Sequence, residues 1–156
     1  MSEVNSDAPN VKIIPPLVYL AGIIVGLLVS MWVPSKLLPN PAVWIIGGIL
    51  FVCGAVLVGS AILMFKSVGT TVRPDRASSR LVIAGPYKMT RNPMYLGLAL
   101  IYLGIAIADQ SIWALILLPI VLIIIQHWAI EPEEAFLQRR FGTEYNSYKA
   151  KVRRWL

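Results

Sequence analysis

The hydrophobic and polar positions along the chain divide it into apolar runs separated by polar segments. Four runs cover Leu17 to Val33, Ala42 to Phe65, Pro93 to Ala108 and Ile112 to Ile130. A helix needs about 20 mostly apolar residues, and not fewer than about 17, to cross the hydrocarbon core of a bilayer. Strands are excluded because an open sheet edge in lipid leaves backbone groups without hydrogen bonds. The pattern therefore predicts an all-α integral membrane protein with about four transmembrane helices.

The third run, 93–108, falls just short of the length that a spanning helix needs. A tight polar turn, Asp109 to Ser111, connects it to the fourth run. We therefore expect the third and fourth runs to cross the membrane together, as a helical hairpin in which the two helices pair.

Polar segments flank these runs. Residues 1–13 form a polar tail that lacks the basic region and cleavage site of a signal peptide, and we expect Met1 to Asn10 to be disordered. Residues 66–92 make too long a stretch for an idle loop in a compact protein, which indicates a functional role. Residues 131–156 carry charges and aromatics at helical spacing. This predicts an amphipathic C-terminal segment on the membrane surface, broken at Gly142, in a chain that forms a single domain.

The composition agrees with a membrane protein. Hydrophobic residues make up 57% of the chain and charged residues 14%, with a mean hydropathy of +0.70. An average soluble domain is about 25% charged. The net charge of +6 could indicate nucleic acid, but the basic residues border apolar runs, so membrane topology explains them and no nucleic-acid partner is predicted. The one cysteine, Cys53, lies inside an apolar run and cannot form an intramolecular disulfide.

The lysines and arginines also predict the orientation. Of 14 such residues, only Lys36 lies in a connection on the second side of a four-span topology. The others lie before the first run, in 66–92 and in 131–156. Because positive residues favour the cytoplasmic side, these segments are expected to share the cytoplasmic face of a multi-pass protein of a bacterial inner membrane.

The first candidate motif is GPY followed by RNPMYLG, which begins at Arg91. Pro93 suits the first turn of a helix, and Asn92 is then a natural N-cap. Arg91 and Tyr95 would flank free backbone N–H groups, an arrangement suited to a carboxylate ligand. The alternative is a capped membrane helix with an interfacial tyrosine and an arginine that reaches the headgroups.

The second candidate motif is EPEE, residues 131–134. One carboxylate could bind a ligand's ammonium group while another handles a proton or a positive charge. The alternative is an ordinary acidic helix start, which the helix dipole favours. His127 lies one turn earlier, and as a single histidine it is expected to form a hydrogen bond at the membrane interface. No metal site is predicted, because there is no second histidine and Cys53 lies in mid-membrane.

A third motif, with aromatic and basic residues, completes the series. Alone, it is typical of an amphipathic segment at the headgroup level. In series, LVIAGPYKMTRNPMYLG and EPEEAFLQRRFGTEYNSYKAKVRRWL resemble the isoprenylcysteine carboxyl methyltransferase and phospholipid methyltransferase superfamily. The resemblance covers Gly69 to Leu156; the first two apolar runs match only in being apolar.

The resemblance implies a pocket for S-adenosylmethionine, enclosed by the last two spans and the flanking cytoplasmic segments, and a lipophilic methyl acceptor. The acidic pair of the superfamily falls on Glu133 and Glu134, which are the predicted catalytic residues. The predicted cofactor-binding residues, which lie in the loop before the third run and at its start, are Ser79, Arg80, Leu81, Val82, Tyr87, Arg91, Asn92, Pro93, Met94 and Tyr95.

Two positions depart from the superfamily pattern. The commoner histidine before the proline is Asn92 here, which cannot titrate near neutral pH. The arginine of eukaryotic prenylcysteine enzymes aligns with Ala129, so bidentate recognition of a substrate carboxylate is not expected. This favours a lipid or a small lipophilic acceptor over a prenylated protein. An amine or thiol acceptor would need a base, for which Glu133 is the candidate. The rival hypothesis is a non-catalytic lipid-binding or assembly protein that keeps the fold.

Overall fold

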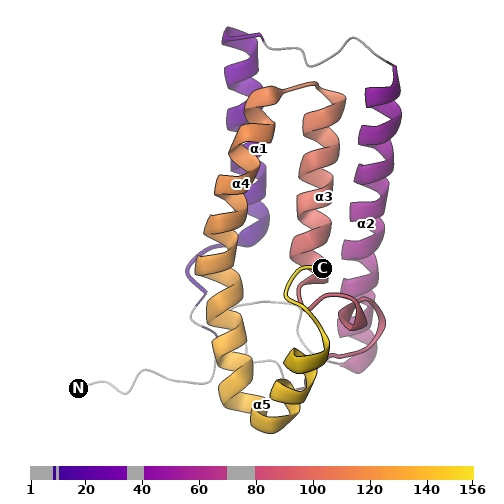
Figure 1. Cartoon of the computed structure of the whole chain (residues 1–156), viewed down its shortest axis with the longest axis vertical. Coiled ribbons are helices and arrows are strands. Elements are labelled where there is room, and N and C mark those ends of the chain that lie inside the picture. The colour runs from indigo at the N-terminus through magenta and orange to yellow at the C-terminus, as the bar shows by residue number, and fades with distance from the viewer. Residues whose placement is uncertain (1–8, 10, 35–40, 70–79) are drawn as a thin grey trace, which may run out of the picture.

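The computed structural model describes residues 9, 11–34, 41–69 and 80–156. Its apolar helices run side by side along the long axis of the molecule (Figure 1). In chain order the elements are α1 (Pro15–Trp32), α2 (Ala42–Val68), the 3-10 helix η1 (Gly85–Lys88), α3 (Pro93–Ala108), α4 (Ile112–Ile125), the π-helical turn η2 (Gln126–Ile130) and α5 (Glu131–Lys151). These described ranges contain no strand. The predicted all-α membrane architecture is confirmed.

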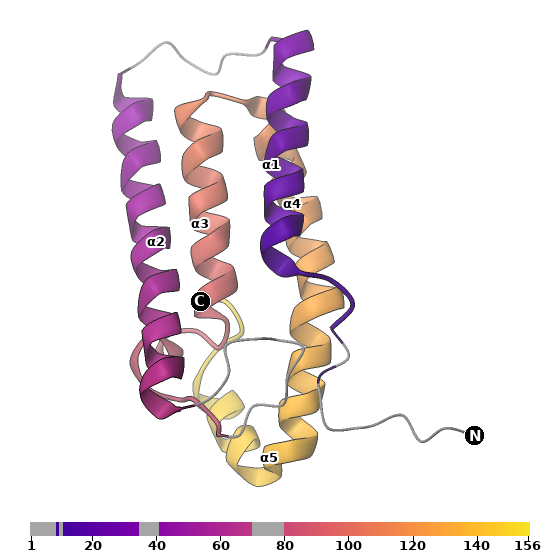
Figure 2. The ribbon, with the colours of Figure 1, turned by 180° about the vertical axis from the view of Figure 1, so that it is seen from behind.

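The helix lengths suit a bilayer. The helices α1, α2 and the continuous helix that begins at Ile112 are each long and apolar enough to cross a membrane. The 16 residues of α3 extend over about 24 Å at 1.5 Å per residue, somewhat less than the hydrocarbon core. This short helix lies between α2 on one side and the α1–α4 pair on the other in both views (Figures 1 and 2).

The main partner of α3 is α2, not α4 as the hairpin prediction held. The reason is a pair of glycines on each helix. A Cβ added to Gly54 would lie 2.5 Å from the carbonyl oxygen of Gly97, and one added to Gly104 would lie 2.6 Å from that of Gly47. Small residues allow this close approach of two backbones in lipid. The tight turn itself is confirmed, since α3 ends at Ala108 and α4 begins at Ile112.

Tyrosine hydroxyls connect the helices within the core. Tyr19 of α1 donates to the carbonyl of Tyr95 at 3.0 Å, and Tyr102 of α3 donates to the carbonyl of Ala114 at 2.9 Å. The first helix also approaches α4 closely, because a Cβ on Gly26 would lie 2.5 Å from the Cα of Ala114. These contacts make α1, α3 and α4 one packed unit, with α2 joined to it through α3.

The C-terminal segment is helical, as predicted, and its position on the membrane surface stays a prediction. The helix α5 continues the direction of α4 (Figure 1), because the backbone N–H of Glu131 bonds to the carbonyl of Gln126 in a π-type turn that carries the chain past Pro132. The predicted break at Gly142 is confirmed: its φ of 48° and ψ of −115° reverse the chain, a conformation that glycine adopts easily. The final residues then run back to the start of α3 (Figures 1 and 2).

Candidate active site

A cavity of about 520 Å³ lies at the end of the bundle opposite the turn at 109–111. Small-molecule sites typically measure about 300–1,000 Å³. Its walls come from the segment before α1, the loop before α3, the start of α3, and both halves of α5. The described parts of 66–92 and 131–156 therefore meet at one end of the molecule.

The cavity gathers most of the predicted site residues. Those that line it are Arg80, Leu81, Val82, Tyr87, Arg91, Asn92, Met94, Tyr95, Glu133 and Glu134. Pro93 does not line it, but is fully buried at the first turn of α3. Ser79 lies outside the described residues. The roles of these residues in cofactor binding and catalysis stay predictions.

Glu133 is the carboxylate that faces the start of α3. The hydroxyl of Tyr95 donates to its Oε2 at 2.9 Å. Burial raises the pKa of Glu133 from its ordinary value of 4.5 to about 7, with the hydrogen bond from Tyr95 acting against this and the charge of Glu134 acting with it. Near neutral pH this side chain therefore exists in both protonation states, which suits a group that accepts a proton.

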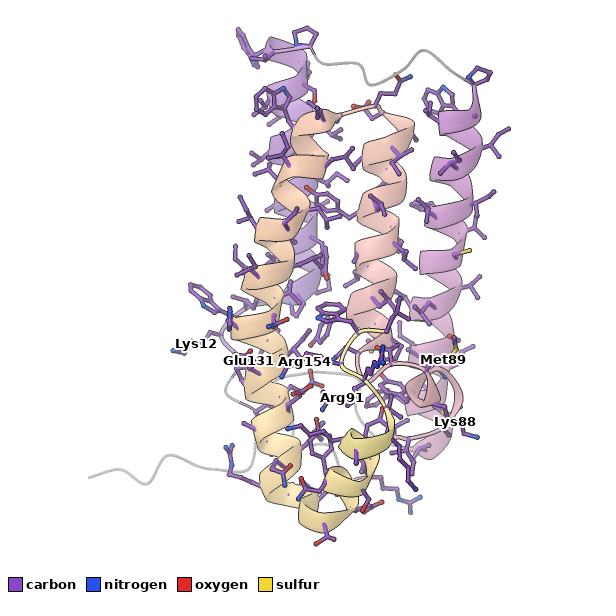
Figure 3. The ribbon with its side chains drawn as sticks, viewed as in Figure 1. Lys12, Lys88, Met89, Arg91, Glu131 and Arg154 are labelled. Atoms are coloured by element: carbon purple, nitrogen blue, oxygen red, sulfur yellow. The ribbon has the colours of Figure 1, made fainter. Side chains whose placement is uncertain are left out.

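Glu134 has a different environment, although it is the next residue. Its Oε1 accepts from Nε of Arg154 at 3.2 Å, and its Oε2 accepts from Nη2 of Arg154 at 2.8 Å. Nη2 of Arg91 lies 3.4 Å from Oε1 of the same carboxylate. Adjacent helical residues point about 100° apart, so one carboxylate faces Tyr95 while the other meets two guanidinium groups. Figure 3 shows Arg91 and Arg154 together at the foot of α3.

Some buried polar atoms near this cluster have no acceptor at hydrogen-bond geometry among the described residues, although Arg91 and Tyr145 lie close enough to interact with each other. They are the Nε and Nη1 atoms of Arg91 and the hydroxyl of Tyr145. A buried donor without an acceptor costs about 1–3 kcal/mol. Burial raises the pKa of Tyr145 to about 12, so its hydroxyl stays protonated at neutral pH. A ligand with oxygen acceptors would therefore find donors here.

Aromatic rings form another wall of the cavity. Phe65 of α2 packs edge-to-face on Tyr87, with ring centroids 5.5 Å apart. The hydroxyl of Tyr148 donates to the carbonyl of Tyr87 at 2.7 Å, which joins the second half of α5 to η1. Phe136 is buried in the first half of α5 and also lines the cavity. This wall offers flat apolar surfaces for an aromatic ligand group.

Sequence reasoning missed the segment before α1. Val11, Lys12, Ile13 and Ile14 line the cavity, and Val11 and Ile13 also pack against the helical core. Of the tail predicted over Met1–Asn10, the described residues include only Pro9, which is buried and lines the cavity as well. The alternation of apolar residues around Lys12 was the available signal.

Asn92 occupies the N-cap position of α3, but its side chain does not cap the helix. Its Nδ2 donates instead to the carbonyl of Arg154 at 3.0 Å, because the C-terminal residues return to this point. Ala129 is fully buried in the helical core and does not line the cavity. The position that carries arginine in the prenylcysteine enzymes therefore faces other helices in this chain.

His127 and Glu131 form a pair outside the cavity. Nδ1 of His127 lies 2.9 Å from Oε2 of Glu131, and both side chains are exposed. The hydrogen bond with His127 is the main reason that the pKa of Glu131 is lowered. An ideal α-helix would place His127 on the same side as Glu134, but the wide π turn between them places His127 outside while Glu134 is buried.

Comparison with known proteins agrees with this geometry. Residues 42–144, about two thirds of the chain, match a family described as "Phospholipid methyltransferase". The chain belongs to the phospholipid methyltransferase family. The match spans α2 to the first half of α5, and confirms the superfamily inferred from the motifs.

A Haemophilus influenzae protein described as "Uncharacterized protein" is 41% identical to this chain over 65 residues, which cover 40% of this chain and 100% of that protein. No solved structure matches the chain. Membership of this family, together with the apolar helices, makes the chain an integral membrane protein of a methyltransferase family.

Proposed function

We propose that this protein is a membrane-embedded methyltransferase that uses S-adenosylmethionine as its methyl donor and a lipophilic molecule as acceptor. The observation that carries the proposal is the cavity, where the half-buried Glu133, the hydroxyl of Tyr95 and the arginine cluster meet below the membrane helices. The family supports the reaction class, and the residues in the cavity support the donor.

The charges around the cavity match those of S-adenosylmethionine. The donor has a carboxylate, an ammonium, a sulfonium and an adenine ring. The free donors of Arg91 and Tyr145 suit the carboxylate. Glu133 suits a positive group, since a carboxylate gains Coulomb energy beside a cation in a partly dry site. The rings of Phe65 and Tyr87 suit the adenine.

The protein's own contribution to catalysis would be alignment, water exclusion and proton handling. S-adenosylmethionine supplies a methyl group that its sulfonium already activates. Residues of α3 and α5 would hold donor and acceptor in line, which is worth several kcal/mol of barrier. An acceptor amine or thiol would lose its proton to Glu133, whereas a carboxylate acceptor would need no base.

The position of the cavity supports a lipophilic acceptor. It lies at the end of four apolar helices, where a lipid headgroup and the start of its chains would be within reach. Ala129 supplies no guanidinium for a prenylcysteine carboxylate, which favours a lipid or a small lipophilic acceptor. We place this end of the bundle on the cytoplasmic side of a bacterial inner membrane, because the lysines and arginines among the described residues lie at it.

Calorimetric titration of the purified protein in detergent with S-adenosylmethionine tests the proposal. The wild type should bind the donor, and His127→Gln, outside the cavity, should bind it equally well. Tyr95→Ala should bind it more weakly while staying monodisperse. Cells fed methyl-labelled methionine should then reveal a labelled lipid or lipophilic product only when the protein is present. A wild type that does not bind the donor would support the non-catalytic alternative.

A further inference from the structure

We propose that Arg154 is a positioning residue of the site: it holds and neutralises Glu134, and thereby leaves Glu133 as the one carboxylate of the pair that is available to the cavity. The catalytic role of Glu133 rests on the proposed function, whereas the contacts of Arg154 are observed in the structure. Arg154 lies beyond the region that matches the family, which ends at residue 144.

The side chain of Arg154 bonds to α5 through a two-point contact. Its Nε and Nη2 each donate to a separate oxygen of Glu134, at 3.2 and 2.8 Å, and its Nη1 lies 3.5 Å from Glu131. The planar guanidinium fits a carboxylate in this way, whereas an ammonium would act as a point charge. Glu134 is 9% exposed, so its charge depends on these partners and not on water.

The main chain at the same place bonds to the loop before α3. The carbonyl of Arg154 accepts from Oγ1 of Thr90 and Nδ2 of Asn92, both at 3.0 Å. The carbonyl of Arg153 accepts from the backbone N–H of Arg91, also at 3.0 Å. Arg153 and Arg154 therefore join two segments that line the cavity, the acidic start of α5 and the entry to α3.

Trp155, the residue after Arg154, fixes this connection to η2 and to the helical core. Its ring N–H donates to Oε1 of Gln126 at 3.4 Å, and the ring packs against the helical core. With both neighbours fixed, the Arg154 side chain loses little further conformational freedom when it binds Glu134. A merely exposed arginine would contribute little, but this one is held in place.

Removing the Arg154 charge has a definite consequence for Glu133. Among the described residues, Glu134 would then keep only the longer ion pair with Arg91, so its negative charge next to Glu133 would be less compensated. A less compensated negative neighbour makes Glu133 hold its proton to higher pH. The substitution leaves the other ionisable residues that line the cavity in place. These are Lys12 from the segment before α1, Arg80, Tyr87 and Arg91 from the region before α3, Tyr95 from α3, and Tyr145 and Tyr148 from the second half of α5.

The test is an infrared titration of Glu133 in the full-length protein without ligand. The carboxyl band of Glu133 is assigned by its loss in Glu133→Gln. We expect Arg154→Gln to raise the titration midpoint by about one pH unit, the lower end of the effect of a nearby charge. Arg154→Lys, which keeps charge but not the two-point geometry, should give a smaller shift. Arg153→Gln is the matched control, because its side chain is exposed and its carbonyl is unchanged.

A double variant separates positioning from general damage. In Arg154→Gln with Glu134→Gln the uncompensated charge is gone and Arg91 remains, so the midpoint should return to the wild-type value or below it. If Arg154→Gln only lowers the melting temperature and leaves the midpoint at the wild-type value, Arg154 is a structural clasp and the inference is wrong. A wild type that fails to bind S-adenosylmethionine would refute the proposed function, while the ligand-free titration would still decide the role of Arg154.

Discussion

Replacing Glu133 by glutamine tests the central residue of the site with the least change in shape. The hydroxyl of Tyr95, which donates to Oε2 at 2.9 Å, can donate to the amide oxygen of glutamine as well. The variant therefore keeps the local hydrogen bond and loses the charge and the basicity. If Glu133 faces the positive centre of the donor or accepts a proton, turnover should fall at least tenfold, a barrier increase of about 1.4 kcal/mol.

The same substitution has the opposite effect on stability. The pKa of Glu133 is 4.5 ordinarily and about 7 in the folded protein. Between these values the folded protein binds more protons than the unfolded chain, so stability falls as pH rises through this window. At about 1.4 kcal/mol per pH unit, the free energy of unfolding would fall by at most on the order of 3 kcal/mol across this window. The actual fall is smaller, because water reaches part of the Glu133 side chain. Glu133→Gln should therefore be more stable than wild type above neutral pH, and equally stable in acid.

The assay follows the transfer of label from methyl-labelled S-adenosylmethionine into the lipid extract of membranes that contain the protein. Thermal unfolding in detergent at acid and alkaline pH gives the stability. Glu131→Gln should have a milder effect, because Glu131 is exposed, does not line the cavity and contacts Arg154 only at 3.5 Å. Full activity in Glu133→Gln together with loss of activity in Glu131→Gln would refute the assignment. Loss of both activity and alkaline stability would make Glu133 a structural residue.

Three further predictions concern the support of the site. The hydrogen bond from Tyr95 lowers the pKa of Glu133, so Tyr95→Phe, which removes this bond, should raise the pH at which Glu133 titrates. An infrared titration that finds no shift would contradict the geometry. Gly54→Val should abolish monodisperse protein in detergent because its side chain would meet the backbone of Gly97, whereas Gly59→Ala, with open space around it, should behave as wild type. Cysteines placed after Phe65 and at Leu156, in a Cys53→Ala background, should both react with a reagent added from the cytoplasmic side. If they react from opposite sides of the membrane, the segments that line the cavity cannot share one face, and the proposed site is wrong.

The helices of this fold could be predicted from the sequence because apolar runs in lipid have few alternatives to a helix. The expected run from 112 to 130 corresponds to α4 and η2, and 93–108 coincides with α3. The pairing of α3 with α2 was harder to predict from the sequence. It depends on glycines that recur seven residues apart on both helices, at 47 and 54 and at 97 and 104, and hydropathy does not register them.

The site was predictable in its residue types but not in their division of labour. The acidic motif gives two adjacent carboxylates with the same chemistry. Only the return of the chain at Gly142 brings Arg154 to Glu134 and leaves Glu133 beside Tyr95. The π turn before Glu131 adds to this, because helical spacing alone would have placed His127 and Glu134 on one side. Contacts between residues 20 or more positions apart in the chain carry no local signal.

Some of the residues that enclose the cavity lie outside the part of the chain that carries the predicted catalytic residues. The family match, 42–144, contains α2, α3 and the acidic motif, but neither Val11 to Pro16 nor Arg154. A methyl transfer site needs to exclude water, since water competes for the activated methyl group and weakens every charge interaction within the site. For the proposed methyl transfer, the segment before α1 would shield the cavity as a wall, and residues 153–155 would do so by connecting α5 to α3.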